Sequence, residues 1–224
     1  MDAYNRKDIG KKTTRDMLSY QGAANYPAPT SPRAANRIAQ LPGTNHYDDD
    51  LGANFRNEVV GSDRNGDAMS RNHRLSDHFI GHIVEAIGET YRGYGPNGIP
   101  QGMSQAVFDF VSACVPSTMT MNVLGALENL CMNPNDRDFK NVVSEISNNG
   151  RNLRAGDGRT NSGIGANFDP SFQSNGAMTP ITADINQAVQ KLATEGAISQ
   201  GLADMALTPL RDGNNAPVTS SDLR

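Results

Sequence analysis

The sequence predicts a mainly α-helical protein, a small helical bundle with long arms of low apolar content. In the middle of the chain, apolar residues recur at spacings of three and four over successive segments. This pattern is typical of helices that bury one face. Residues 75–146 hold 20 of the 42 Leu, Ile, Val and Phe residues, whereas residues 1–74 hold eight. The middle segment can therefore bury a core, and the N-terminal third cannot build one alone.

Composition divides the chain into four parts. Three prolines within residues 26–35 favour an extended segment in the polar N-terminal third. The Gly/Asn-rich stretch after the bundle has no apolar period, and a loop of that length is uncommon inside a compact domain. The predicted parts are an extended N-terminal arm (1–74), a helical bundle core (75–149), a Gly/Asn-rich linker loop (150–180), and short helices with a polar tail (181–224).

Four helices are predicted for the bundle, in the ranges 76–92, 104–115, 118–132 and 136–148. Ser76 and Ser104 are suitable N-caps, and Pro116 cannot continue the second helix. Their predicted core residues are Leu75, Phe79, Ile80, Ile83, Val84, Ile87, Val107, Phe108, Phe110, Val111, Cys114, Met121, Leu124, Leu127, Cys131, Phe139, Val142, Val143 and Ile146.

Two more short helices are predicted near the C-terminus, over residues 184–196 and 198–207. Their apolar residues are Ile185, Leu192, Ile198, Leu202 and Met205. These are too few to stabilise isolated helices in water. We therefore expect this helical pair to dock on the bundle or on another chain.

Cysteine usage and targeting signals bear on the compartment. Cys114 and Cys131 lie in apolar helical patterns, which predicts buried, reduced thiols in a reducing environment. The N-terminus lacks the apolar region of a secretory signal, and no apolar run approaches the ~20 residues that span a bilayer. We expect a soluble, non-secreted protein without a membrane partner, located in a virion or in the cytoplasm.

The most suggestive motif is HFIGHIVEAIGE, residues 78–89. At 100° per residue, His78, His82, Glu85 and Glu89 fall within about 60° of one another, opposite the apolar face. The favoured interpretation is a solvated or interface face. A His–Glu cluster that titrates near neutral pH is one alternative. The other is a metal site with His78, His82 and Glu85 as candidate ligands, although the HExxH pattern is absent.

Other motif matches lack the context that their chemistry needs. GYGPNG (93–98) follows a helix instead of a strand, and DRNGDAMSRNHR (63–74) lacks the glycine and the final glutamate of a calcium loop. GDGRTNSGIG (156–165) has neither the Lys-Ser/Thr of a phosphate loop nor a helix behind it. The sequence has no GxSxG, and neither cysteine has a basic neighbour. No catalytic residue and no cofactor is therefore predicted.

Charge argues against a nucleic-acid surface on the bundle. Residues 75–149 contain three Arg or Lys and eight Asp or Glu. The N-terminal tail carries Arg6, Lys7, Lys11, Lys12 and Arg15, partly offset by three aspartates. We expect at most weak phosphate contacts, from this tail or from Arg151, Arg154 and Arg159.

These features favour a structural, non-enzymatic protein. A rigid bundle with arms that cannot fold alone is typical of a subunit in a large symmetric assembly, such as a virus or bacteriophage particle. Coat, connector, tail and internal roles are all open, and the partners would be other copies and other virion proteins. One alternative is a small metal-dependent or acid/base enzyme that uses the His78/His82/Glu85/Glu89 stripe. Another is a monomeric effector that folds on a single host partner.

Overall fold

The computed structural model describes residues 61–62, 68–91, 103–149, 151–157, 164, 167–170, 172 and 175–217. Over these residues it is mainly α-helical, as the sequence predicts. The helices are α4 (Asp77–Thr90), α5 (Gln105–Cys114), α6 (Ser117–Met132), α7 (Asp136–Ser147), α9 (Pro180–Thr194) and α10 (Gln200–Ala206). The strands are β1 (Gly61–Ser62), β2 (Ala68–His73) and β3 (Leu153–Asp157).

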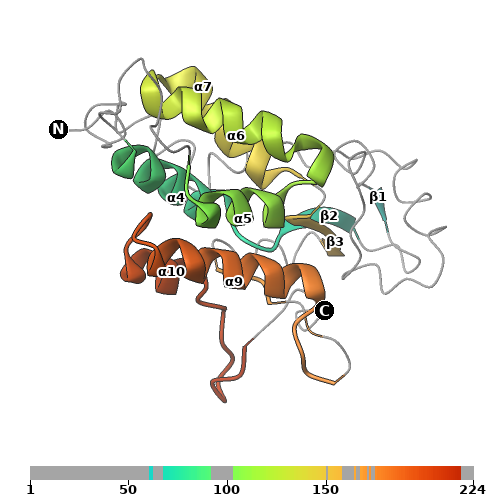
Figure 1. Cartoon of the computed structure of the whole chain (residues 1–224). Helices are drawn as coiled ribbons and strands as arrows, with labels where there is room; N and C mark the ends of the chain where they lie inside the picture. Colours follow the sequence, from blue (N-terminus) through green and yellow to red (C-terminus); the bar gives the residue numbers. More distant parts are fainter. Residues whose placement is uncertain are drawn as a thin grey trace.

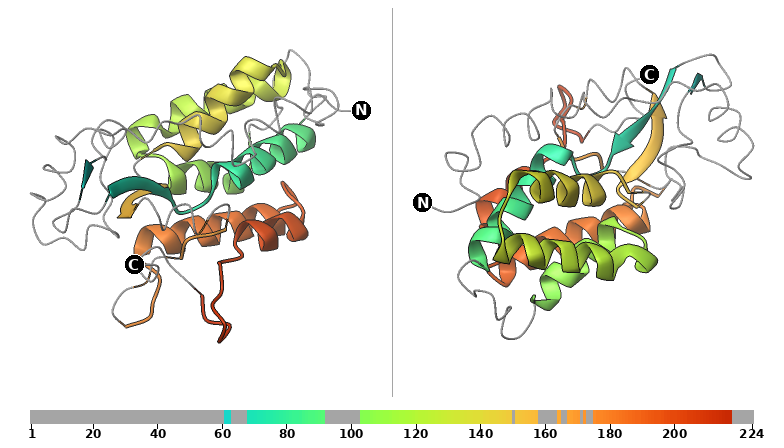
Figure 2. Two further views of the ribbon diagram at one scale, coloured as in Figure 1. Left: turned by 180° about the vertical axis from the view of Figure 1, so that it is seen from behind. Right: turned by 90° about the horizontal axis from the view of Figure 1, so that it is seen from above.

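The helices are arranged in three layers. α4 and α5 lie between the α6–α7 pair on one side and the α9–α10 pair on the other (Figure 1). The small sheet lies at one end of this stack, and two further views show the same arrangement (Figure 2). The middle layer is thus covered on both sides, which makes it the centre of the core.

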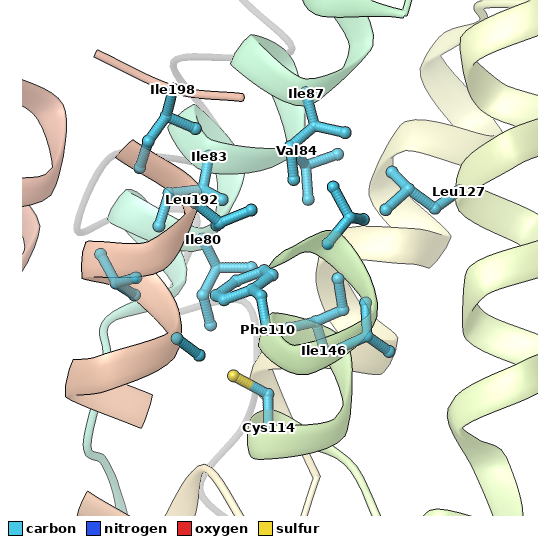
Figure 3. Close-up of a cluster of buried hydrophobic side chains, with 14 of the residues drawn as sticks. Ile80, Ile83, Val84, Ile87, Phe110, Cys114, Leu127, Ile146, Leu192 and Ile198 are labelled. Atoms are coloured by element: carbon cyan, nitrogen blue, oxygen red, sulfur yellow. The ribbon is translucent and has the colours of Figure 1, made fainter. Parts of the chain in front are cut away.

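Side chains from every helical layer meet in this core (Figure 3). Members with no exposed surface include Ile80, Ile83, Val84, Ile87, Phe110, Cys114, Leu127, Ile146 and Leu192. Ile198, in the turn before α10, is also buried. Burial of a side chain of this size stabilises the fold by about 1.5–3 kcal/mol. The predicted bundle therefore shares one core with the C-terminal helices.

The predicted helix boundaries agree closely with the observed ones for α4 to α7. The Oγ atom of Ser76 accepts a hydrogen bond from the Phe79 amide at 3.3 Å, which confirms the predicted N-cap of α4. Ser104 occupies the N-cap position of α5, but its side chain makes no capping hydrogen bond. At α7, the Asn135 side chain caps the amide of Asp138 at 2.9 Å.

Two predicted core residues, Met121 and Phe108, are exposed, and so is Met205, an apolar residue of the predicted C-terminal helical pair. Met121 is 69% exposed, Met205 57% and Phe108 38%. α6 contains one charged residue, Glu128, so its sequence pattern does not select a single buried face. The buried residues of α6 are Thr120, Val123, Leu127, Leu130 and Cys131. This face is rotated from the predicted one, which explains the exposure of Met121.

The sheet was not predicted from the sequence. β2 pairs antiparallel with both β1 and β3, in the order β1-β2-β3, and Met69 lies opposite Asp157 at one end of the β2–β3 pair. β2 thus joins the end of the predicted arm to the start of the predicted linker loop. Neither β2 nor β3 contains Val, Ile, Thr, Phe, Tyr or Trp, so residue propensity does not predict a strand in either segment.

A buried polar cluster attaches the sheet to the helices. Arg74 is fully buried, and its Nη1 donates to Oγ1 of Thr182 on α9 at 3.0 Å. Asn152 is also fully buried. Its Nδ2 donates to the carbonyl oxygens of Leu75 and Ser147 at 2.9 Å, and its Oδ1 accepts from the Leu75 amide at 2.9 Å. These bonds satisfy backbone groups that would otherwise be costly to bury.

The C-terminal helices dock on the bundle. α9 packs against α5, and α10 contacts α9 and α4. Gly196 makes the turn between α9 and α10 with a φ of +77°, a conformation that glycine adopts without strain. Its amide donates to the Ala193 carbonyl, and the Ala197 amide donates to the Leu192 carbonyl, which completes a Schellman cap.

Candidate functional site

α4 brings three members of the predicted His/Glu stripe together. Nδ1 of His82 lies 3.6 Å from Oε2 of Glu85, one helical turn away. The rings of His78 and His82 meet edge to face, with centroids 4.8 Å apart. The helical spacing therefore produced the proximity that the sequence predicted. The sequence pattern could not predict the solvent exposure of these side chains.

The inner part of the stripe is shielded from water. Glu85 is 8% exposed, and His78 and His82 are half-buried, whereas Glu89 is exposed. Partial burial raises the pKa of the Glu89 carboxyl above its ordinary value, and the negative charge of Glu85 adds a smaller increase. Of these four residues, Glu89 is the most exposed, and Glu85 is buried.

The stripe does not form a complete ion-binding site within the described part of the chain. There, no three His, Cys, Asp or Glu side chains are grouped as metal ligands. Structural zinc sites use four protein ligands and catalytic zinc sites use three. What the geometry offers is an imidazole–carboxylate contact between His82 and Glu85, of the kind that general acid–base catalysis also uses.

A polar groove of about 570 Å³ lies along the contact between α5 and α9. Its lining residues are Asp109, Ser112, Ala113, Arg151, Asp184, Gln187, Ala188 and Lys191. The four from α9 lie at spacings of three and four, so they share one face of that helix. The groove is a tertiary feature, because the facing residues come from α5 and from the turn before β3.

Both basic residues of this groove, Lys191 and Arg151, form ion pairs within the chain. Nζ of Lys191 lies 2.5 Å from Oδ2 of Asp109. The hydrogen bond from Lys191, and to a smaller extent the one from Gln105, lowers the pKa of the Asp109 carboxyl. Nη2 of Arg151 lies 2.9 Å from Oδ2 of Asp184, while its Nε donates to the Ala113 carbonyl at 3.0 Å. A phosphate at Arg151 would compete with Asp184. These ion pairs connect α9 with α5 and with the turn before β3. Lys191 and Arg151 each have an acidic partner within the chain.

The cysteines are poor candidates for nucleophiles. Cys114 and Cys131 are both free and buried, as predicted. Burial raises the pKa of each thiol to about 12. Because the thiolate is the reactive form, neither cysteine is activated at neutral pH.

The solvent-facing side of α6 differs from that of the neighbouring helix α7. We define the α6 outer face as its exposed residues, Ser117, Thr118, Met121, Asn122, Gly125, Ala126 and Asn129. None of these residues is charged. By contrast, the neighbouring helix α7 exposes Asp136, Arg137 and Lys140. Glu128, the one charged residue of α6, is half-buried, so the exposed residues of this face are depleted in charge, as the cores of protein–protein interfaces are.

The three weak motif matches gain no support. Residues 68–73, the second half of the calcium-loop match, form strand β2 and pair with β3, which is incompatible with a calcium-binding loop. The match at 93–98 lies outside the described residues, as do most residues of the match at 156–165. Gly156 and Asp157 of that match belong to β3.

Sequence reasoning missed both the groove and the α6 outer face. The groove depends on how α5 packs against α9, which no local pattern reveals. The α6 face did leave a signal, since residues 117–132 contain a single charged residue. In the helices that the structure describes, none is long and apolar enough to cross a membrane. Comparison of the chain with family models, with curated proteins and with solved structures gives no match.

Proposed function

We propose that this protein is a structural subunit of a large symmetric assembly, of the kind that forms a virus or bacteriophage particle. The α6 outer face carries the proposal, because it is an exposed helix surface with a 69% exposed methionine and no charge. Charged residues are depleted at the cores of protein–protein interfaces, and the exposed residues of α6 show that depletion.

The distribution of apolar residues also supports this proposal. The described residues from Leu75 to Ala206 share one core, drawn from all three layers of helices. The eight Leu, Ile, Val and Phe residues that precede Leu75 all lie within residues 1–60, too few for a second core of their own. In the proposed role, residues 1–60 contact neighbouring subunits, and the helical body sets the spacing between them.

Parts of the predicted arm and of the C-terminal region belong to the folded body, so fewer residues remain as connectors. Residues 68–74 and 151–157 form the sheet and its attachment to the helices, and α9 and α10 cover the core. The proposed connectors are therefore residues 1–60 and the surfaces of the body. The proposed partners are other copies of the chain and other virion proteins. No catalytic step is assigned to the chain.

Mass and protease protection measured together test this function. We expect light scattering of the purified full chain to give a mass of many subunits, which falls on dilution. Trypsin should cut at Lys11, Lys12 and Arg15 much faster in the dissociated sample, because neighbours then no longer cover them. Cleavage at Lys140 on α7 provides the matched control, since that helix belongs to the body in both states. A chain that remains monomeric at every concentration, with equal cleavage rates, would show that the proposal is wrong.

A further inference from the structure

Asparagine is followed by glycine at four places in the chain, at residues 65–66, 97–98, 149–150 and 175–176. Asparagine is a chemically labile residue, and a following glycine leaves its own backbone nitrogen open to the asparagine side chain because it has no Cβ atom. The first two pairs lie outside the described residues. Asn149 and Asn175 are both described, and the fold places them in opposite environments.

Asn175 lies in an exposed turn before α9. Its side-chain Oδ1 accepts a hydrogen bond from the Ala177 amide at 3.0 Å, so the side chain is folded back along the backbone of Gly176. Gly176 has a φ of +78°, and a Cβ atom built there would meet no described atom within 4 Å. The side-chain carbonyl of Asn175 therefore lies beside the glycine nitrogen, with room for both groups to move.

Asn149 lies at the end of α7 and is only 4% exposed. Its Nδ2 donates to the Glu145 carbonyl at 2.8 Å, and its own carbonyl oxygen accepts from the Leu153 amide at 2.9 Å. Both its side chain and its backbone are therefore fixed. A reaction that turns the side chain toward the next residue would first have to break these bonds.

We propose that Asn175 is a site of spontaneous deamidation, whereas the fold protects Asn149. The Gly176 nitrogen attacks Cγ of Asn175 and forms a new C–N bond. Nδ2 leaves as ammonia and takes up the proton that the Gly176 nitrogen loses. Water then opens the resulting succinimide at one of its two carbonyls, which gives aspartate or isoaspartate. Water is the only co-reactant, and the inference does not depend on the proposed assembly function.

The turn favours this reaction in two ways. Holding the carbonyl next to its nucleophile replaces a search by the free chain with a local ring closure. Negative charge develops on Oδ1 as the nitrogen attacks Cγ. The Ala177 amide already donates to that oxygen and can stabilise the charge.

Deamidation at Asn175 would change the segment that leads into α9. It adds one negative charge to a chain whose formal net charge is −4. The isoaspartyl product also adds a methylene group to the backbone between Phe172 and Met178, which face each other across an antiparallel β-bridge. The protein would therefore acquire, with time, a surface that differs in charge and in backbone path just before the N-cap of α9 at Thr179.

Peptide mapping of the aged full chain tests the inference. The purified protein is incubated at mildly alkaline pH and digested, and mass spectrometry follows the replacement of each side-chain NH₂ by OH. We expect Asn175 to react at least tenfold faster than Asn149 in the folded chain, because Asn149 reacts only after local opening. In denaturing urea the two rates should converge, since glycine follows both residues. Equal rates in the folded chain, or an Asn175 that reacts only in urea, would overturn the inference.

Two substitutions test the role of the turn. Ala177→Pro removes the N–H that donates to Oδ1, so it should slow deamidation of Asn175 several-fold in the folded chain and leave its rate in urea unchanged. Ala177→Ser keeps the N–H and is the matched control, with an unchanged rate. Equal rates for the two variants in the folded chain would contradict the role of the Ala177 amide.

Discussion

The contact between α5 and α9 and the outer face of α6 show two ways in which a helix surface is completed. Along α5 and α9, charged groups pair within the chain, as Lys191 does with Asp109 and Arg151 with Asp184. On α6, the exposed residues are uncharged, and Met121 extends into solvent. The first surface is satisfied inside one molecule, whereas the second has the features of a surface that another molecule covers.

This difference indicates which surface of the described residues should be tested first for contact with another molecule. Buried side chains of α9, among them Ile185, Val189 and Leu192, make the C-terminal helices part of the body, and the ion pairs neutralise the charges along the contact with α5. The exposed residues of α6 carry no charge, as is common at the core of a protein–protein interface. The function is therefore expected on α6 more than in the groove.

The largest contrast is expected when a buried aromatic residue is compared with the exposed methionine. Phe110→Ala removes a fully buried ring from the middle layer and should lower the free energy of unfolding by about 3–5 kcal/mol. Met121→Ala should change it by less than about 0.5 kcal/mol, because the side chain has few contacts in one copy. Urea unfolding at a concentration where the chain is dissociated measures both. Comparable losses in the two variants would contradict the assignment of Met121 to the surface.

A buried charge in the body should have an intermediate effect. Burial raises the pKa of Asp77, at the start of α4, to about 6 from 3.8, while the hydrogen bond from the His78 amide opposes this rise. The folded state then binds more protons than the unfolded state between these two values, so stability falls as pH rises from 3.8 to about 6. At about pH 7, Asp77→Asn should increase the free energy of unfolding by on the order of 2 kcal/mol.

The pH dependence of that gain provides the control for Asp77. At about pH 4 the folded carboxyl is already protonated, so the difference between Asp77→Asn and the unsubstituted chain should shrink to a small fraction of its neutral value. Denaturant unfolding at the two pH values measures it. A variant that is less stable at neutral pH would mean that the Asp77 carboxylate stabilises the helix start more than its burial costs.

Smaller effects are expected from the ion pairs of the groove. Asp184→Asn should cost less than about 1 kcal/mol, because the carboxylate is half-exposed and solvent screens the pair. The lowered pKa of Asp109 means that its contribution is present above the ordinary pKa and is lost as pH falls through the folded value. In an NMR titration, Lys191→Met should move the Asp109 midpoint upward toward 3.8. Lys140→Met, on α7, should leave it unchanged.

The smallest effect on subunit association is expected from the histidine stripe. Replacing both His78 and His82 by alanine should alter the mass distribution less than Met121→Lys does, since the stripe lies on α4 and not on the α6 outer face. The double variant also tests the enzyme hypothesis. Loss of a stoichiometric metal, measured by elemental analysis, would instead identify the stripe as an ion site and favour that hypothesis.

Local patterns predicted the helices better than the faces they bury. Apolar spacing gave α4 and α7 with nearly their observed boundaries, because each has one charged side and one apolar side. α9 begins at Pro180, earlier than residue 184, since Thr179 and Pro180 provide an N-cap and a first helical residue. On α6 the near absence of charge removed the contrast that identifies a buried face, so the predicted core included Met121.

Features that depend on distant residues could not be predicted. The β2–β3 pairing joins polar segments about 80 residues apart, so no local pattern within either segment predicts it. The Arg74–Thr182 and Lys191–Asp109 contacts also join residues far apart in the chain. By contrast, the His82–Glu85 contact was predictable because helical geometry alone brings residues three apart together.

The most direct test of the central claim is the mass of the purified full chain in solution over a range of concentrations. We predict particles of many subunits that dissociate on dilution, and a shift toward smaller species for Met121→Lys but not for Met205→Lys. A compact monomer at every concentration, with the same mass in all three chains, would contradict it.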